Sequence, residues 1–256
     1  KKTAIFFQVQ GGGEIVGEDL TRLDQLQKNG LRVFQLTHHH DNPLAGGGLM
    51  SKTSGLTKLG FEAVERMNSL GLIPDLSHAS DQTGLDTFKT SKKPVIISHG
   101  AARAIVNNAR CAPDDIIRGV AKSGGVMGIF MMSFWLTPDP VPTVDSYIRQ
   151  LRHVINVGGI EAVGIANDVP LSGEQGLVEA KGDNAAAVKN YLGWWNSIAK
   201  MGGILGFDKQ PQHVAIPELN NIDRIRTIRA ALEKEKFKSS EIEKIMGRNW
   251  IRVLAS

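Results

Sequence analysis

Short apolar runs alternate with amphipathic stretches along the whole chain, and this alternation strongly limits the folds open to it. The apolar runs occupy residues 4–10, 32–38, 72–78, 94–99, 125–131 and 162–168. Continuous apolar runs are typical of strands that are buried on both faces of a parallel sheet. Their alternation with helical patterns indicates βα units. The sequence therefore predicts an α/β fold with six parallel strands.

The stretches between these runs have the spacing of amphipathic helices. We expect helices over 18–29, 57–70, 81–89, 114–123 and 143–157, and three more near 185–201, 222–235 and 239–255. No Pro- or Ser-rich linker and no change of composition divides the 256 residues. The sequence therefore predicts one domain over 1–256.

Two arrangements of the six units compete. One is an open, doubly wound sheet, and the other is a (β/α)8 TIM barrel that lacks two units. A doubly wound nucleotide-binding protein needs a glycine-rich turn after its first strand. The turn GGGEIVG at 11–17 matches neither G-x-G-x-x-G nor a P-loop, so it indicates a nucleotide only weakly.

Composition excludes several classes of protein. No run of about 18 apolar residues is present, so the sequence predicts no transmembrane helix. The single cysteine, Cys111, excludes an internal disulfide and a cysteine-rich zinc module. The net charge of +4 comes from dispersed basic residues, which predicts a solvated surface and no nucleic-acid partner.

The chemically informative residues gather at the carboxyl ends of the expected strands. These residues are Gln10, His38, His78, His99 and Asp168. In a (β/α)8 barrel all strand ends of this kind face one rim, where such enzymes have their active sites. Imidazoles and carboxylates are zinc ligands. Two successive strands end in Ser-His, so we predict that His78 and His99 bind one metal ion.

The other histidines and Cys111 are weaker candidates. His39 and His40 point to alternate sides of an extended chain, which makes them unlikely to serve together as ligands. His153 falls in a helix and His213 in a Pro-flanked loop, so both are expected to be structural. No base is placed near Cys111, which argues against a nucleophile.

Arg110 follows the strand that ends in His99 and precedes a helix that starts with Pro113. It is therefore expected on the same rim as the histidines. Its guanidinium could hold a substrate carboxylate through two parallel hydrogen bonds. From the spacing alone, an exposed arginine without such a role is an equal alternative.

Five segments resemble the membrane dipeptidase (renal dipeptidase) family of the amidohydrolase superfamily. They are LTHHHDNPLAGG (36–47), GLTKLGFEAVERMNSLGLIPDLSHAS (55–80), KPVIISHGAARAIVNNARCAPDD (93–115), EAVGIANDVP (161–170) and IMGRNWIRVLAS (245–256). Their order and spacing extend the resemblance over nearly the whole chain.

The resemblance implies a (β/α)8 barrel with two zinc ions and a metal-activated hydroxide that attacks the carbonyl of a small dipeptide. By position, His78 and His99 resemble two zinc ligands, and His38 resembles the histidine that contacts substrate and tetrahedral intermediate. Arg110 resembles the arginine that holds the substrate carboxylate. Asp168 resembles the aspartate that handles the substrate amine and the proton of the attacking water. A D-residue at the C-terminal position of the dipeptide is also implied.

Two departures from the family pattern affect these expectations. The six strands correspond to strands three to eight, so the first strand with its zinc-binding His-x-Asp is not found in this sequence. We expect a fragment of a longer gene product, either completed by another chain that supplies the missing strands or shortened from that product. The expected protein partner is this second chain or a further copy of the same chain. The bridging glutamate of the family corresponds to Gln10, whose neutral amide is a poorer ligand, although Glu14, four residues on, could substitute for it. We therefore predict either a site with one zinc ion or an altered site with two.

Two further functions compete with the dipeptidase. One is another small-molecule hydrolase on the same scaffold, acting on a lactone or an amide such as an N-acyl amino acid. The other is a non-catalytic binding protein that has lost its metals. Arg110 together with Asp168 favours a zwitterionic substrate such as a dipeptide. The change from glutamate to Gln10 instead favours a function that has diverged from that of the family.

Overall fold

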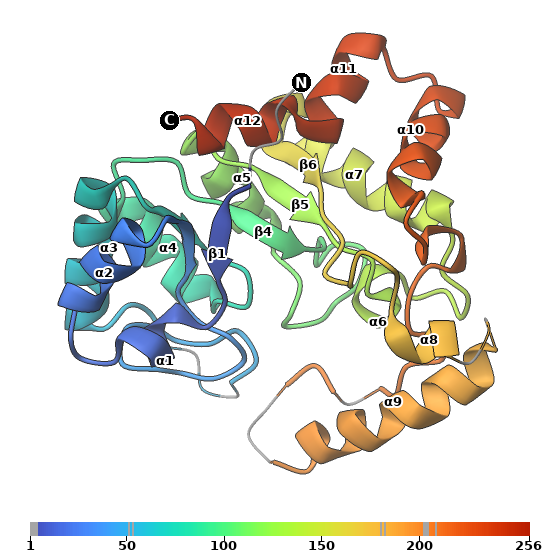
Figure 1. The fold of residues 1–256 in the computed structure, drawn as a ribbon, viewed down its shortest axis with the longest axis horizontal. Helices are drawn as coiled ribbons and strands as arrows, with labels where there is room; N and C mark the ends of the chain where they lie inside the picture. Colours follow the sequence, from blue (N-terminus) through green and yellow to red (C-terminus); the bar gives the residue numbers. More distant parts are fainter. Residues whose placement is uncertain are drawn as a thin grey trace.

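Six parallel strands form the centre of the molecule, in the order in which they occur along the chain (Figure 1). The computed structural model describes residues 5–50, 52, 54–179, 181, 183–201, 205–207 and 209–256. The strands are β1 (Phe7–Val9), β2 (Leu31–Gln35), β3 (Ile73–Asp75), β4 (Ile97–Gly100), β5 (Met127–Ile129) and β6 (Val163–Ile165). A parallel bridge between Asp75 and Ile96 joins the sheet β1-β2-β3 to the sheet β4-β5-β6.

The strand order distinguishes the two arrangements that the sequence left open. A doubly wound sheet reverses its strand order at a switch point, and the described strands show no reversal. Among the described residues, β1 pairs only with β2 and β6 pairs only with β5. The predicted parallel α/β fold is confirmed, and closure into a barrel stays a prediction.

Helices follow the strands and cover the sheet. The larger ones are α2 (Thr21–Lys28), α3 (Lys58–Leu70), α4 (Asp81–Thr90), α5 (Asp114–Lys122), α7 (Val144–Gly158), α9 (Asn184–Ala199) and α10 (Arg224–Lys234). From α2 to α5 each helix packs against the next, and α7 then packs against α5 and α10 (Figure 1). The helices are therefore neighbours in the same order as the strands that they follow along the chain.

Side-chain caps explain where several helices begin. Thr57 accepts a hydrogen bond from the backbone N–H of Gly60 at the start of α3, and Ser80 accepts one from Thr83 at the start of α4. Before α7, Thr143 and Ser146 form a capping box. Such caps satisfy N–H groups that have no partner within the helix.

The elements differ from the sequence predictions mainly at their ends. The strands are three to five residues long, shorter than predicted, and residue 4 of the first predicted strand lies outside the described residues. Three short helices, α1 (Gly12–Val16), α6 (Ser133–Leu136) and α8 (Gln175–Glu179), were not predicted. The predicted helix 239–255 is divided into α11 (Ser239–Glu243), a π-helical turn (Lys244–Arg248) with a kink, and α12 (Asn249–Leu254).

One large cluster of buried apolar side chains extends from Val16 to Ile245, consistent with a core shared by the strands and helices. In α1, Gly12 and Gly13 are buried in this region. A Cβ on Gly12 would lie 2.4 Å from the ring of Phe34, so the glycine run allows close packing. Among the described helices, none has the length and apolar character needed to cross a membrane.

Candidate metal centre

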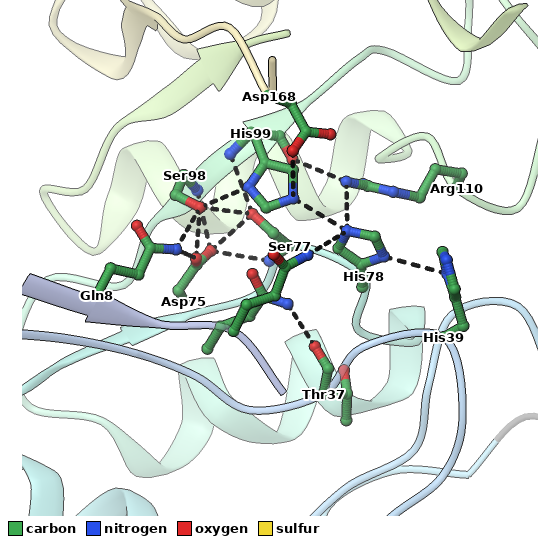
Figure 2. A network of polar contacts seen from close by, with 12 residues as sticks. Gln8, Thr37, His39, Asp75, Ser77, His78, Ser98, His99, Arg110 and Asp168 are labelled. Carbon is green, nitrogen blue, oxygen red and sulfur yellow. Dashed lines mark hydrogen bonds and ion pairs between the residues drawn. The ribbon is translucent and has the colours of Figure 1, made fainter. Parts of the chain in front are cut away.

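The two predicted ligands, His78 and His99, lie side by side near the carboxyl ends of the adjacent strands β3 and β4. His99 belongs to β4, whereas His78 lies three residues beyond β3. Their Nε2 atoms are 3.0 Å apart, and both side chains are buried (Figure 2). His78 has a positive φ of 66°. A left-handed conformation is costly for a residue with a Cβ, and such strain often occurs at functional sites.

His38 and His39 join this pair from the loop after β2. The His38 ring stacks on His78 with 4.4 Å between centroids, and His39 Nδ1 lies 3.3 Å from His78 Nδ1. Potential ligand atoms of His38, His39 and His78 all lie within 4.8 Å of one another. Of the pair His39 and His40, the structure places His39 in this cluster of potential ligands. The chain bends at residues 38–40, so the alternation of an extended strand does not apply there.

Arg110 lies in the loop before α5, and its guanidinium is buried next to the histidines. Its Nη2 is 2.9 Å from His78 Nε2 and 3.3 Å from the carbonyl oxygen of His99. Phe130 and Trp135 flank the guanidinium at 5.2 and 5.6 Å from their ring centroids. Among the described residues, no carboxylate lies within ion-pair distance of this arginine.

Asp168 and Gln10 complete the set predicted from the sequence. Asp168 follows β6 with a φ of 59°, and its Oδ1 lies 3.9 Å from His99 Nε2. Gln10 follows β1, and its Nε2 lies 3.2 Å from His78 Nε2. Glu14, the possible substitute for Gln10, is an exposed residue of α1. The structure thus brings together His38, His78, His99, Arg110, Asp168 and Gln10.

Burial sets the ionisation of the imidazoles. It lowers the pKa of His78 and His99 well below the usual value, and the nearby positive charge of Arg110 lowers both further. Burial, helped by His38 and Arg110, lowers the pKa of His39 to about 3. Neutral imidazoles are the form that binds metal ions. Several neutral imidazoles with converging nitrogens therefore fit a divalent cation such as zinc.

The pKa of the Asp168 carboxyl is shifted upward, opposite to the shift of the imidazoles. Burial raises the pKa of Asp168, while the positive charge of Arg110 acts against that shift. The change favours the neutral acid relative to an exposed aspartate. Asp168 is thus suited to holding or releasing a proton within reach of His99.

Sequence reasoning missed one buried residue of this region, Asp75, at the end of β3. Its carboxylate accepts hydrogen bonds from Ser77 and Ser98, the residues that precede the two predicted ligands (Figure 2). The available signal was an aspartate inside the predicted strand 72–78.

Two other residues were placed as expected. His153 pairs with Asp114 at 2.7 Å, away from the site. Cys111 is buried, and burial raises the pKa of its thiol to about 12.

The fold and the site together define the class of the molecule: a parallel α/β protein with buried imidazoles and an arginine at the carboxyl ends of its strands. The sequence profile of the membrane dipeptidase family, peptidase family M19, matches residues 1–183. The chain belongs to this family, whose members are metallo-dipeptidases.

Curated relatives agree with this assignment. An uncharacterized dipeptidase of Schizosaccharomyces pombe is 35% identical over 175 residues, which make up 65% of this chain and 41% of the relative. Dipeptidase 3 of Rattus norvegicus is 33% identical over 174 residues, 65% of this chain and 36% of the relative. The matched region thus spans about two fifths of the length of these relatives.

Solved structures show the same fold at low sequence identity. An amidohydrolase from Pseudomonas aeruginosa is 24% identical with a TM-score of 0.79, and the match covers 99% of this chain and 72% of that one. A metallo peptidase from Rhodobacter sphaeroides, liganded with a phosphinate mimic of L-Ala-D-Ala, is 18% identical with a TM-score of 0.75. That match covers 98% of this chain and 62% of the other.

Proposed function

We propose that the chain carries the site of a zinc-dependent dipeptidase, built on a partial (β/α)8 barrel formed by residues 1–256. The main support is the convergence of buried, neutral imidazoles beside an arginine without a carboxylate partner. Because β1 and β6 each have one unpaired edge among the described residues, a second copy or another chain that supplies strands would pair there.

His78 and His99 are the proposed zinc ligands, with Gln10 and His39 close to His78. Bound zinc would lower the pKa of a coordinated water and polarise the substrate carbonyl. The side-chain amide of Gln10 carries no charge and cannot replace a bridging carboxylate. We therefore propose one zinc ion at this site in place of two. The protein residues around the zinc bind and orient the substrate.

Arg110 is the proposed partner of the substrate's C-terminal carboxylate. Its guanidinium is buried and held between two aromatic rings, and no carboxylate of the described residues neutralises it. The guanidinium donates only to neutral acceptors, and its Nε has no hydrogen-bond partner among the described residues. An incoming carboxylate would therefore gain a strong, charge-assisted interaction. This feature favours a dipeptide over a neutral amide or lactone.

Asp168 and His38 are assigned to the reacting end of the substrate. Asp168 would bind the substrate ammonium and exchange a proton with the attacking water at Oδ1, the oxygen that faces His99. His38, stacked on His78, would donate a hydrogen bond to the carbonyl oxygen, which gains negative charge as the carbonyl carbon becomes tetrahedral. The ligand of the Rhodobacter sphaeroides relative supports a D-residue at the C-terminal position.

An assay with matched dipeptides and a matched variant tests this function. The zinc-loaded chain is expected to hydrolyse L-Ala-D-Ala and to lose activity in a chelator. Arg110→Lys keeps the charge but removes the paired hydrogen bonds, and it should raise KM about 10- to 100-fold. The same variant should leave the hydrolysis of a dipeptide amide, which has no carboxylate, nearly unchanged.

The outcome of this assay also separates the competing functions. Hydrolysis of a lactone without hydrolysis of any dipeptide would contradict the proposal and favour another hydrolase on the same scaffold. A folded chain that binds zinc and dipeptide but hydrolyses nothing would favour a binding protein.

A further inference from the structure

A buried carboxylate lies beneath the two proposed zinc ligands. Asp75 ends β3 and is fully buried. Its Oδ1 accepts hydrogen bonds from Ser77 N (2.9 Å), Ser77 Oγ (2.8 Å) and Ser98 N (2.9 Å). Its Oδ2 accepts from Gln8 Nε2 (2.7 Å) and Ser98 Oγ (2.5 Å) (Figure 2). The two backbone N–H groups and the Gln8 amide nitrogen can only donate, and both hydroxyls are placed to donate as well. These five contacts favour the ionised, acceptor-only form and oppose burial, which raises the pKa of Asp75.

The single proton of the Ser98 hydroxyl fixes the direction of the next hydrogen bond. That proton goes to Asp75 Oδ2, because the carboxylate can only accept. The Ser98 oxygen then accepts from Gln8 Nε2 at 2.9 Å and must also accept from His99 Nδ1 at 2.9 Å. His99 therefore carries its proton on Nδ1.

This arrangement leaves a lone pair on the other nitrogen of His99, which faces the site. Its Nε2 lies 3.0 Å from His78 Nε2 and 3.9 Å from Asp168 Oδ1. A histidine ligand binds its metal ion through the unprotonated nitrogen, and the hydrogen bond at the other nitrogen fixes the tautomer.

We propose that Asp75 is a positioning residue that acts through Ser98 to hold His99 in the Nδ1–H tautomer and so keeps Nε2 free for zinc. The same carboxylate binds Ser77 and thereby fixes the turn that leads into His78. This inference rests on the proposed zinc site and deepens it.

Asp75→Asn tests the proposal with little change in shape. The three donors on Oδ1 hold the amide oxygen in place, so the amide NH2 faces Gln8 and Ser98. The Gln8 amide, which could flip and take the Ser98 proton on its oxygen, is removed in the double variant Gln8→Leu/Asp75→Asn. In that variant Ser98 must accept from the amide at position 75 and donate its proton to His99 Nδ1. The expected result is the Nε2–H tautomer of His99 in the metal-free chain, read from its imidazole ¹⁵N chemical shifts. Zinc affinity, measured by competition with a chromophoric chelator, should fall roughly 10- to 100-fold.

A second substitution should restore the tautomer. In Gln8→Glu/Asp75→Asn, the carboxylate and the amide exchange places across a 2.7 Å hydrogen bond. The new carboxylate at position 8 can accept the Ser98 proton, so Ser98 can again accept from His99. A general loss of packing would not be reversed by such an exchange. The matched control is Asp86→Asn, a mostly buried aspartate that accepts from Leu56 N and Gln82 Nε2 outside this network.

Ser98→Ala provides an independent test if Asp75→Asn fails to fold. It removes the link alone and should give a mixture of His99 tautomers with weaker zinc binding. Retention of the Nδ1–H tautomer in Gln8→Leu/Asp75→Asn, or unchanged tautomer and affinity in Ser98→Ala, would overturn the proposal. A wild-type chain that shows the Nδ1–H tautomer but binds no zinc would contradict the proposed function and leave the role of Asp75 in fixing the tautomer supported.

Discussion

Individual histidines at the centre are held neutral by their surroundings. Burial is the larger cause and the guanidinium of Arg110 the second for both His78 and His99. An imidazole that stays neutral in the native state resists protonation, which keeps its lone pair available for a metal ion. The same effect makes the stability of the metal-free protein sensitive to acid.

His39 allows this sensitivity to be measured for one group. Its pKa is about 3 in the native state against a usual value of 6.5, so below pH 6.5 the unfolded state binds more protons than the native state. Stability must therefore fall as the pH falls through 6.5. Between pH 7.5 and 5.5, the chelator-treated wild type should lose about 1 kcal/mol more unfolding free energy than His39→Gln. Urea unfolding at the two pH values provides the measurement.

The comparison with His39→Gln is needed because two carboxyls act in the opposite direction. Burial raises the pKa of Asp75 and Asp168. At pH values between the raised native pKa and the usual pKa of an aspartate, the native state binds more protons than the unfolded state. In this pH range the contribution of the two carboxyls to stability rises as the pH falls. The difference between wild type and variant removes this contribution. Equal losses in the two proteins would contradict the account of His39.

Gln10 is the residue that we expect to limit the number of bound metal ions. Its amide lies 3.2 Å from His78 Nε2. A carboxylate there would add a negative charge and an oxygen ligand of the kind that zinc accepts. Gln10→Glu should therefore bind zinc at least tenfold more tightly or bind a second equivalent, as measured by elemental analysis after dialysis.

Glu14 provides the control for this prediction. It is exposed in α1, so Glu14→Gln should leave zinc stoichiometry and affinity unchanged. A loss of zinc in Glu14→Gln, with no gain in Gln10→Glu, would show that Glu14 takes the place of the family's glutamate.

At the scale of elements, α3 shows how close packing opposes helix propensity. Gly60 lies inside α3, where alanine would favour the helix by about 1 kcal/mol. However, a Cβ at this position would lie only 1.9 Å from the carbonyl oxygen of Leu44, which belongs to the backbone and cannot rotate away. Overpacking of this kind typically costs about 1–3 kcal/mol.

Two glycine-to-alanine substitutions should therefore differ in sign. Gly60→Ala is expected to lower the unfolding free energy by about 1–2 kcal/mol. Gly193→Ala in α9, where a Cβ meets nothing within 4 Å, should raise it by about 0.5–1 kcal/mol. Chemical denaturation of both variants gives the two values. The same sign for both would contradict the packing explanation for α3.

The elements were predictable where a periodic pattern determines them. Helices such as α3, α4 and α5 lie within a residue of the predicted ranges, because apolar spacing and capping residues are local signals. Strand ends were less predictable. Residues 36–38 and 76–78 lie outside β2 and β3, although the predicted strands 32–38 and 72–78 included them.

At the scale of the whole molecule, the sequential order of six parallel strands gathers side chains from distant parts of the chain at one place. The sequence identified most of them, since the candidates were expected at or after the carboxyl ends of the strands and parallel strands end at one edge. His39 and Asp75 were not predicted as site residues, because their roles depend on contacts between residues that are far apart in the sequence. His39 reaches His78 only because of a bend, and Asp75 bonds to residues of two strands besides its own.

Zinc titration of the chain and of single histidine variants tests the central claim most directly. We predict that His78→Gln and His99→Gln each weaken zinc binding at least 100-fold, because each removes a proposed ligand. His153→Gln, which alters the histidine paired with Asp114 away from the site, should bind zinc like the wild type. Wild-type zinc affinity in both His78→Gln and His99→Gln would contradict the assignment of these residues as the metal site.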